Sequence, residues 1–377
     1  MRHKSPTRTR RVLAVLTLGA SLFVGCVLVA PRVAVEPVTF EHPDEILKGT
    51  GSAARYWALA DRRVFAVMAF LNATGYDEEA PNAQMSPLRI KVRETLASRL
   101  AAHPDMLREW RRYYDAHRRG SWQYANFVLS FGADYPFRRT RPNRELTYRD
   151  TAWDLRDLPE VLNDFWITAE LGRLWEELQP EYAAEIGRYR PARMAEEMEQ
   201  LWRYLRMPRR DDWIVVHIPN PLQRHFTASA NQFGEYFYSI DGPGSNGGGL
   251  NVHEYLHTFI NDSARQCYPS QARKLKQYFA AGKHAPISAS YQDPRTWVSE
   301  CLVFALDNRL WARRVSSHQN DDEMRARVQS LSQSGLTLVA PLYTALADFE
   351  KTDVPFDRYL PILLSDLPEY HEGADGR

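Results

Sequence analysis

Two histidines four residues apart, His253 and His257, constrain this chain more than any other feature. The residues around them, Val252 to Ile260, are apolar at helical spacing and predict a largely buried helix. On such a helix the two imidazole rings project from the same face, one turn apart. Both rings could then bind a single Zn²⁺ ion at about 2.1 Å. The pattern therefore predicts a metal-binding helix.

Glu254 directly follows the first histidine, so its carboxylate can reach a metal-bound water without ligating the metal. Zinc lowers the pKa of such a water toward about 7. A neighbouring carboxylate can then take the proton of the water as the water attacks a carbonyl. We therefore expect Zn²⁺ as the cofactor and Glu254 as the general base.

A third zinc ligand is required, because catalytic zinc usually has three protein ligands and one open position. Glu300 is the best candidate, since it lies in an apolar helical segment where a carboxylate without a partner is costly to bury. Alternatively, Glu300 faces solvent or pairs with Arg295, and His284 is the third ligand. Asp307 lies on the same helix face as Glu300 and is expected to orient a ligand histidine.

A strand-like run, the HEYLH motif and a second helix carrying Glu300 together resemble the gluzincin branch of zinc metallopeptidases, or an uncharacterised bacterial zincin-like branch. The resemblance covers residues 213–315. It implies the same three ligands and general base, and an extended substrate paired with the strand predicted over 235–240. The chain departs from the pattern in its long gap before Glu300 and at Phe304, where some gluzincins have Asp.

The oxyanion of a tetrahedral intermediate needs a hydrogen-bond donor near the metal. Five side chains are candidates for this role: His225, Tyr236, Tyr238, Tyr291 and Tyr343. For each of them, a packing or surface role is the alternative.

The first 30 residues have the form of an export segment. A basic leader up to Arg11 precedes the uncharged run 12–30, which is just long enough to span a bilayer. The basic flank should stay in the cytoplasm, so the rest of the chain is predicted to be exported. A lipobox-like sequence would lipidate Cys26, whereas apolar residues up to Ala30 favour an uncleaved anchor, and Thr9-Arg10-Arg11 resembles a twin-arginine signal. We expect attachment to a membrane in the periplasm or cell envelope rather than free secretion.

Cys267 and Cys301 are the two cysteines that follow the export segment. An oxidising compartment would allow them to form a disulfide. Such a bridge would join the segment after the metal helix to the residue beside Glu300 and would fix the third ligand. Two unpaired buried thiols are the alternative.

Helical periodicity dominates the rest of the chain. Helices are predicted over about 55–72, 88–100, 105–117, 121–131, 157–178, 181–206, 296–314, 322–350 and 356–366. Strand-like runs over 213–218 and 235–240 precede the metal helix. We expect a mostly helical α+β protein, with a large helical N-terminal part and a zincin-like catalytic part that begins with a small sheet. The predicted divisions are a signal or anchor segment 1–30, a linker 31–50, a helical region 51–206, a catalytic region 207–368 and a tail 369–377.

Basic and acidic residues nearly cancel, 48 against 47, which argues against a nucleic-acid partner. The sequence therefore predicts an exported or membrane-attached zinc metallohydrolase that acts on a peptide or protein substrate. Two alternatives are a zincin-like domain that binds without catalysis, and a helical surface lipoprotein in which the HEYLH motif is accidental.

Overall fold

The computed structural model describes residues 46–76, 85–142, 149–208, 212–245, 249–285, 291, 293–314 and 319–370. Within these residues the chain is mostly helical and contains a small mixed sheet of five strands, which confirms the α+β class. The described residues all belong to one unit, Val38–Arg377. None of their helices combines the length and the apolar character needed to cross a bilayer. The predicted export segment and most of the predicted linker and tail lie outside the described residues.

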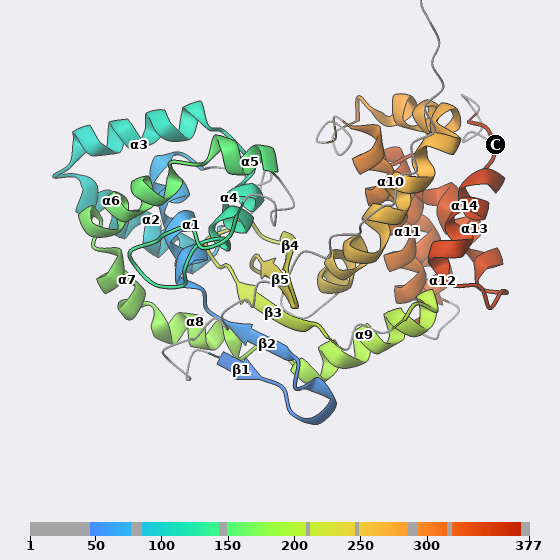
Figure 1. The fold of residues 1–377 in the computed structure, drawn as a ribbon, viewed down its shortest axis with the longest axis horizontal. Coiled ribbons are helices and arrows are strands. Elements are labelled where there is room, and N and C mark those ends of the chain that lie inside the picture. The colour runs from blue at the N-terminus through green and yellow to red at the C-terminus, as the bar shows by residue number, and fades with distance from the viewer. Residues whose placement is uncertain are drawn as a thin grey trace, which may run out of the picture. The chain divides into compact units, whose positions relative to one another are not determined.

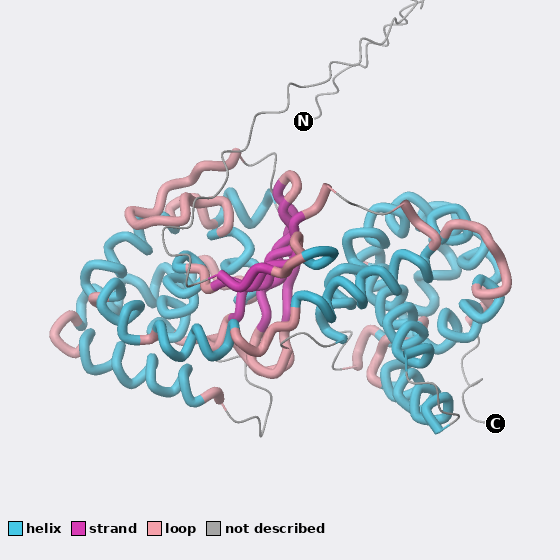
Figure 2. Tube along the Cα trace, turned by 90° about the horizontal axis from the view of Figure 1, so that it is seen from below, coloured by secondary structure: helices cyan, strands magenta, loops and turns pink. Residues whose placement is uncertain are grey.

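The strands of the sheet, magenta in Figure 2, have the order β1-β2-β3-β5-β4. Its strands are β1 (Ile46–Lys48), β2 (Tyr56–Leu59), β3 (Ile214–Pro219), β4 (Ala228–Phe233) and β5 (Tyr236–Asp241). The central strands β2, β3 and β5 are parallel, and β1 and β4 pair antiparallel at the two edges. Every residue of β5 is buried, whereas β4 alternates buried and partly buried side chains, as expected for a central and an edge strand.

Three predictions about the sheet were wrong. First, the helix predicted from residue 55 starts only at Arg62, because Tyr56–Leu59 forms a strand that pairs with β3. Second, Ile46–Lys48, which was assigned to the linker, forms a strand that pairs with β2. The third error concerns the substrate. Strand β5 matches the strand predicted over 235–240, but both of its edges are hydrogen-bonded, to β3 and to β4. A substrate strand therefore cannot be added to β5. Within the described residues, the open edge on that side of the sheet belongs to β4.

Helix α1 (Arg62–Thr74) lies at the centre of a group of helices that precede β3 in the sequence (Figure 1). Its N-cap residue Asp61 accepts hydrogen bonds from the backbone N–H groups of Arg63 and Val64. The carboxylate of Asp61 also forms a buried ion pair with Arg63 at 2.6 Å. Around α1 pack α2 (Pro87–Leu100), α3 (Pro104–Ala116), α4 (Ser121–Val128), α5 (Arg149–Asp154), α6 (Leu158–Thr168), α7 (Leu171–Glu177) and α8 (Gln179–Ile186).

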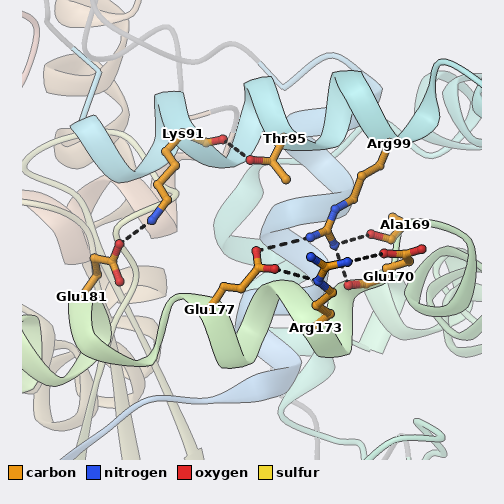
Figure 3. A network of polar contacts seen from close by, with 8 residues as sticks. All are labelled: Lys91, Thr95, Arg99, Ala169, Glu170, Arg173, Glu177 and Glu181. Carbon is orange, nitrogen blue, oxygen red and sulfur yellow. Dashed lines mark hydrogen bonds and ion pairs between the residues drawn. The ribbon is translucent and has the colours of Figure 1, made fainter.

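Ion pairs on the surface join α2 to α7 and α8 (Figure 3). Lys91 pairs with Glu181 at 2.6 Å, and Arg99 pairs with Glu177 at 3.3 Å. Arg99 also donates to the backbone carbonyls of Ala169 and Glu170, which follow the end of α6. Exposed ion pairs each contribute little to stability, so the hydrophobic core and not this network holds the helices together.

A second core surrounds α10 (Gly249–Gly282), the long helix that carries the HEYLH motif. The other helices of this core are α9 (Pro191–Leu205), α11 (Pro294–Arg314), α12 (Gln319–Gln333), α13 (Val339–Phe349) and α14 (Phe356–Asp366). Successive residues of β3 face opposite cores, since Val215 belongs to the second core and Val216 to the first. The sheet thus separates two groups of helices (Figure 1), and it takes strands from both the predicted helical and the predicted catalytic region.

Three of the long predicted helices are each divided into two. The helix predicted over 157–178 breaks at Glu170, whose φ is 50°, and the one over 322–350 breaks at Gly335, whose φ is 110°. A positive φ cannot continue a right-handed helix. The helix over 181–206 is interrupted before Pro191, which starts α9 because proline favours the first turn of a helix.

Candidate metal centre

The three predicted ligands meet between α10 and α11. His253 and His257 lie one turn apart on α10, with their Nε2 atoms 3.3 Å apart. Glu300 of α11 places Oε1 3.2 Å from Nε2 of His253 and Oε2 3.6 Å from Nε2 of His257. One ligand atom from each residue can be chosen so that all lie within 4.8 Å of one another. The group can therefore hold a metal ion.

The spacing of these donor atoms suits a tetrahedral ion. Ligands bound at about 2.1 Å in a tetrahedron lie about 3.4 Å from one another. The two Nε2 atoms are 3.3 Å apart, Oε1 of Glu300 is 3.2 Å from that of His253, and Oε2 is 3.6 Å from that of His257. The side chains of His253 and Glu300 are only 11% and 14% exposed. A buried carboxylate needs a cation or hydrogen bonds to offset its loss of hydration. The contacts with His253 and His257 meet this need for Glu300.

Glu300 and His253 change each other's proton affinity. Burial opposes the charged form of both groups, but the hydrogen bond and the attraction between them lower the pKa of Glu300 and raise the pKa of His253 to about 9. The alternative that Glu300 faces solvent or pairs with Arg295 is thus wrong. Arg295 instead lies over the ring of Tyr268.

Asn261 orients His257, a role that the sequence analysis missed. Its Oδ1 lies 3.1 Å from Nδ1 of His257. An amide oxygen only accepts hydrogen bonds, so this contact assigns the proton to Nδ1 and leaves the lone pair of Nε2 directed at the cluster. Asn261 follows His257 by four residues, and this spacing on one helix face was the available signal.

Glu254 is partly buried beside the two histidines. Burial raises the pKa of its carboxyl, and the charges of His257 and His253 oppose the shift. A raised pKa brings this carboxyl closer to neutral pH, which suits a group that takes up a proton and returns it.

Tyr291 is the oxyanion candidate that the structure brings to the cluster. Its hydroxyl donates a hydrogen bond to Glu300. Burial, and then the charges of Glu300 and Glu254, raise the pKa of this hydroxyl well above its usual value. Tyr291 therefore stays protonated and can donate a hydrogen bond at neutral pH.

The other four oxyanion candidates lie elsewhere: Tyr236 against Trp57, Tyr238 against Arg63, Tyr343 beneath Arg309, and His225 in the loop before β4. Within the described residues, none of them contacts the ligand cluster. Their positions in the sequence gave no means of separating them from Tyr291.

Two residues of α11 lie near His253. The ring of Phe304 packs against the imidazole, with ring centroids 4.7 Å apart. The charge of Asp307 is among the influences that raise the pKa of His253, and its role in orienting a ligand histidine stays a prediction.

His284 is not a ligand in this structure. It is exposed and follows Gly282, the last residue of α10. The helix continues from His257 to Gly282, a length of roughly 38 Å at 1.5 Å per residue, and so carries His284 far from the cluster.

The predicted disulfide is not formed, since Cys267 and Cys301 are both free thiols. The metal helix does not end after its motif, and it carries Cys267 about 15 Å along its axis from His257. Cys301 is fully buried beside Glu300.

A buried polar network joins the motif helix to the sheet. Nδ1 of His217 on β3 lies 2.8 Å from Asp241 at the end of β5, and its Nε2 lies 2.5 Å from the hydroxyl of Tyr255 on α10. Asp241 also accepts hydrogen bonds from Tyr189 at 2.9 Å and Ser239 at 2.6 Å. These donors satisfy a carboxylate that is almost fully buried.

No protein-family model matches this chain, and comparison with curated proteins and with solved structures found no match. The geometry of the ligand cluster is therefore the basis for a functional proposal.

Proposed function

We propose that this protein is a zinc-dependent hydrolase that cleaves peptide bonds. His253, His257 and Glu300 are the proposed ligands, and Glu254 is the proposed general base. The observation that carries the proposal is the convergence of three side chains from two helices, with the two Nε2 atoms 3.3 Å apart and the two carboxylate oxygens of Glu300 at 3.2 and 3.6 Å from them. This spacing suits zinc bound by two imidazoles and a carboxylate, with one position left for substrate or water.

A zinc ion bound there would supply Lewis-acid chemistry, which activates a water molecule and polarises a carbonyl at neutral pH. Glu254 accepts the proton of the attacking water and returns it to the leaving amine. Its raised pKa matches both halves of this transfer. Tyr291 donates its one hydroxyl proton to Glu300, and it would serve the developing oxyanion by turning that hydrogen bond away from Glu300.

The sheet supports a peptide as the substrate. Strand β4 pairs with β5 on one side, and on its other side no strand of the described residues covers it. Helix α10 packs beside β4, so an extended chain added to this edge would run alongside the motif helix. Backbone hydrogen bonds from an edge strand hold an extended peptide without regard to most of its side chains.

Export remains part of the proposal, on the basis of the basic leader and the uncharged run 12–30. Fractionation of cells that express the full chain, with mass analysis of the mature N-terminus, tests it. A chain in the envelope fraction that starts at a lipidated Cys26 or retains residues 1–30 supports attachment. An unprocessed chain in the cytoplasmic fraction contradicts it.

Elemental analysis of the purified protein tests the metal site. We expect about one zinc per chain in the wild type, and loss of the metal in His257→Ala and Glu300→Ala. His284→Ala is the matched control and should keep its zinc. A folded wild type that takes up no added zinc would contradict the metal site.

Turnover of a peptide library tests the activity separately. Glu254→Gln should keep its zinc and lose about 10²- to 10⁴-fold in kcat, the usual contribution of a general base. If the wild type binds zinc but cleaves no peptide, the proposed metal site stands and the proposed hydrolase activity is overturned. Unchanged turnover in Glu254→Gln would overturn the assigned base.

A further inference from the structure

An exposed phenylalanine stands just before the open edge strand of the sheet. Phe226 precedes β4 by two residues, and it is 71% exposed, more than any other large apolar side chain that the structure describes. Its φ is 53°, a value that bulky residues rarely adopt. Single exposed apolar residues are common on protein surfaces. One that also strains the backbone is not, and strained residues cluster at functional sites.

The loop that carries Phe226 is fixed in place. The N–H of Phe226 donates to the carbonyl of Pro243 at 2.9 Å, and the N–H of Gly242 donates to the carbonyl of Thr227 at 2.7 Å. One edge of the phenyl ring packs against Gly244, where a Cβ atom would lie only 2.8 Å from Cε1 of the ring. The loop therefore holds the ring at one edge and leaves most of it open to solvent.

The backbone of β4 next to this loop faces the open edge of the sheet. The carbonyl of Asp241 accepts a hydrogen bond from the N–H of Asn220 at 2.7 Å, on the β3 side of β5. Ala228 faces Asp241 in the register, so this pair is not hydrogen-bonded. Because backbone groups alternate along an antiparallel pair, the N–H and C=O groups of Ala228 and Ala230 point away from β5. An extended peptide can pair with them.

The end of β4 next to Phe226 is the end at which the motif helix meets the sheet. Asp241 lies opposite the first residue of β4 and is joined through His217 to Tyr255 of α10. Its charge adds to burial in raising the pKa of the Glu254 carboxyl, so Asp241 lies close enough to act on the proposed general base. A peptide paired with β4 would thus pass both Phe226 and the region of Glu254.

We propose that Phe226 determines which peptides bind along β4, by packing its ring against an apolar side chain of the peptide. This inference rests on the proposed function, because it takes a peptide as the ligand of that site. Removing two apolar surfaces from water stabilises the complex, and a phenyl ring adds the attraction between aromatic groups. The loop is already fixed, so binding costs little ordering of the ring.

Binding of defined peptides tests this selection without any turnover. The probes are acetylated and amidated hexapeptides of alanine that carry phenylalanine, leucine or serine at each position in turn. They are titrated into the full chain with zinc and the change Glu254→Gln, which prevents cleavage. At one position we expect phenylalanine and leucine to bind at least about tenfold more tightly than serine, a preference within reach of one buried apolar side chain.

Phe226→Asn in the same chain should reduce this preference to less than about twofold. Asparagine tolerates a positive φ, so the variant removes the ring and keeps the loop, and it should bind the serine peptides as before. Phe226→Tyr keeps the ring and should keep the preference. Trp153→Asn is the matched control, because it removes a ring of α5 that is 64% exposed, and it should leave the preference unchanged.

The outcomes separate this inference from the proposed hydrolase. The role of Phe226 is overturned if no peptide binds, if no position prefers an apolar side chain, or if Phe226→Asn keeps the preference. If the wild type cleaves peptides but shows no such preference, the hydrolase stands and the role of Phe226 falls. If the wild type cleaves nothing and the preference is found and lost in Phe226→Asn, the hydrolase falls and peptide selection by Phe226 stands.

Discussion

The hydroxyl of Tyr255 lies 2.5 Å from Nε2 of His217, and this contact joins the motif helix to the centre of the sheet. Asp241 only accepts hydrogen bonds, so Nδ1 of His217 carries a proton, and the hydroxyl of Tyr255 is the hydrogen-bond partner of Nε2. Tyr255 directly follows Glu254 in the HEYLH motif and lies between the two histidines in the sequence. The network therefore fixes the rotation of α10 that turns both histidines toward Glu300.

Tyr255→Phe should destabilise the fold, because it leaves Nε2 of the buried His217 without a hydrogen-bond partner. We expect the free energy of unfolding to fall by about 1–3 kcal/mol, the usual cost of an unpaired buried polar group. Urea denaturation measures the change. Tyr359→Phe is the control, since its hydroxyl forms no hydrogen bond with any residue that the structure describes, and it should change stability by less than about 0.5 kcal/mol. Equal effects of the two variants would show that the Tyr255 bond adds nothing.

The ligand cluster could be predicted because its signals are local. His253 and His257 are related by helical spacing alone, and Glu300 stood out as a carboxylate in an apolar helix. Asn261 has the same kind of local signal and was overlooked. The partners of Tyr255, by contrast, come from β3 and β5, and no periodicity along the chain reports a contact between distant strands and a helix.

The errors in the fold have a related origin. Tyr56 and Leu59 share the spacing of the helix that follows them, and only their pairing with β3 shows that this segment is a strand. The length of α10 was also missed, because the apolar pattern around the motif weakens before Gly282. Tertiary packing, and not propensity, sustains a helix of that length. Because the helix continues to Gly282, the predicted disulfide of Cys267 and the alternative ligand His284 were wrong.

Glu350 should make the stability of the protein depend on pH. Its side chain is 12% exposed and pairs with Arg313 at 3.2 Å and with Arg309, while Tyr204 donates a hydrogen bond at 3.0 Å. Burial alone would raise the pKa of this carboxyl, but Arg309 and the other partners lower it below its usual value. A lowered pKa in the folded state stabilises the protein above the unfolded pKa of about 4.3, and the stabilisation is lost as the pH falls through the folded value.

Glu350→Gln should therefore cost about 1–3 kcal/mol at pH 7 and progressively less below about pH 4.3. Free energies of unfolding at pH 7, 5 and 3.5 for both proteins measure the difference. Glu109→Gln, an exposed change on α3, should show no such trend. A deficit in Glu350→Gln that is the same at all three pH values would contradict the role of its charge.

Gly282 closes α10 against the turn that follows α12. A Cβ atom at this position would lie 2.0 Å from the carbonyl oxygen of Gly335, which is backbone and cannot rotate away. Gly282→Ala should destabilise the protein by about 1–3 kcal/mol, as overpacking does. Gly172→Ala is the matched control, because its Cβ would meet Trp166 at an ordinary 3.5 Å, and it should stabilise α7 by up to about 1 kcal/mol. Thermal unfolding of both variants distinguishes them, and equal shifts would contradict the close approach.

Tyr291→Phe tests whether its hydroxyl acts on the reacting atoms or only on Glu300. As an oxyanion donor the hydroxyl should contribute to kcat, and its loss should lower kcat about 10²- to 10³-fold with the zinc content unchanged. As a support for Glu300 alone it should weaken zinc binding and leave kcat at saturating zinc near the wild-type value. Tyr343→Phe is the control, because the ring of Tyr343 packs under the guanidinium of Arg309, and it should change neither quantity. We expect the loss in kcat, because the charges of both Glu300 and Glu254 raise the pKa of the Tyr291 hydroxyl, so the hydroxyl lies close enough to feel the proposed base as well as the ligand.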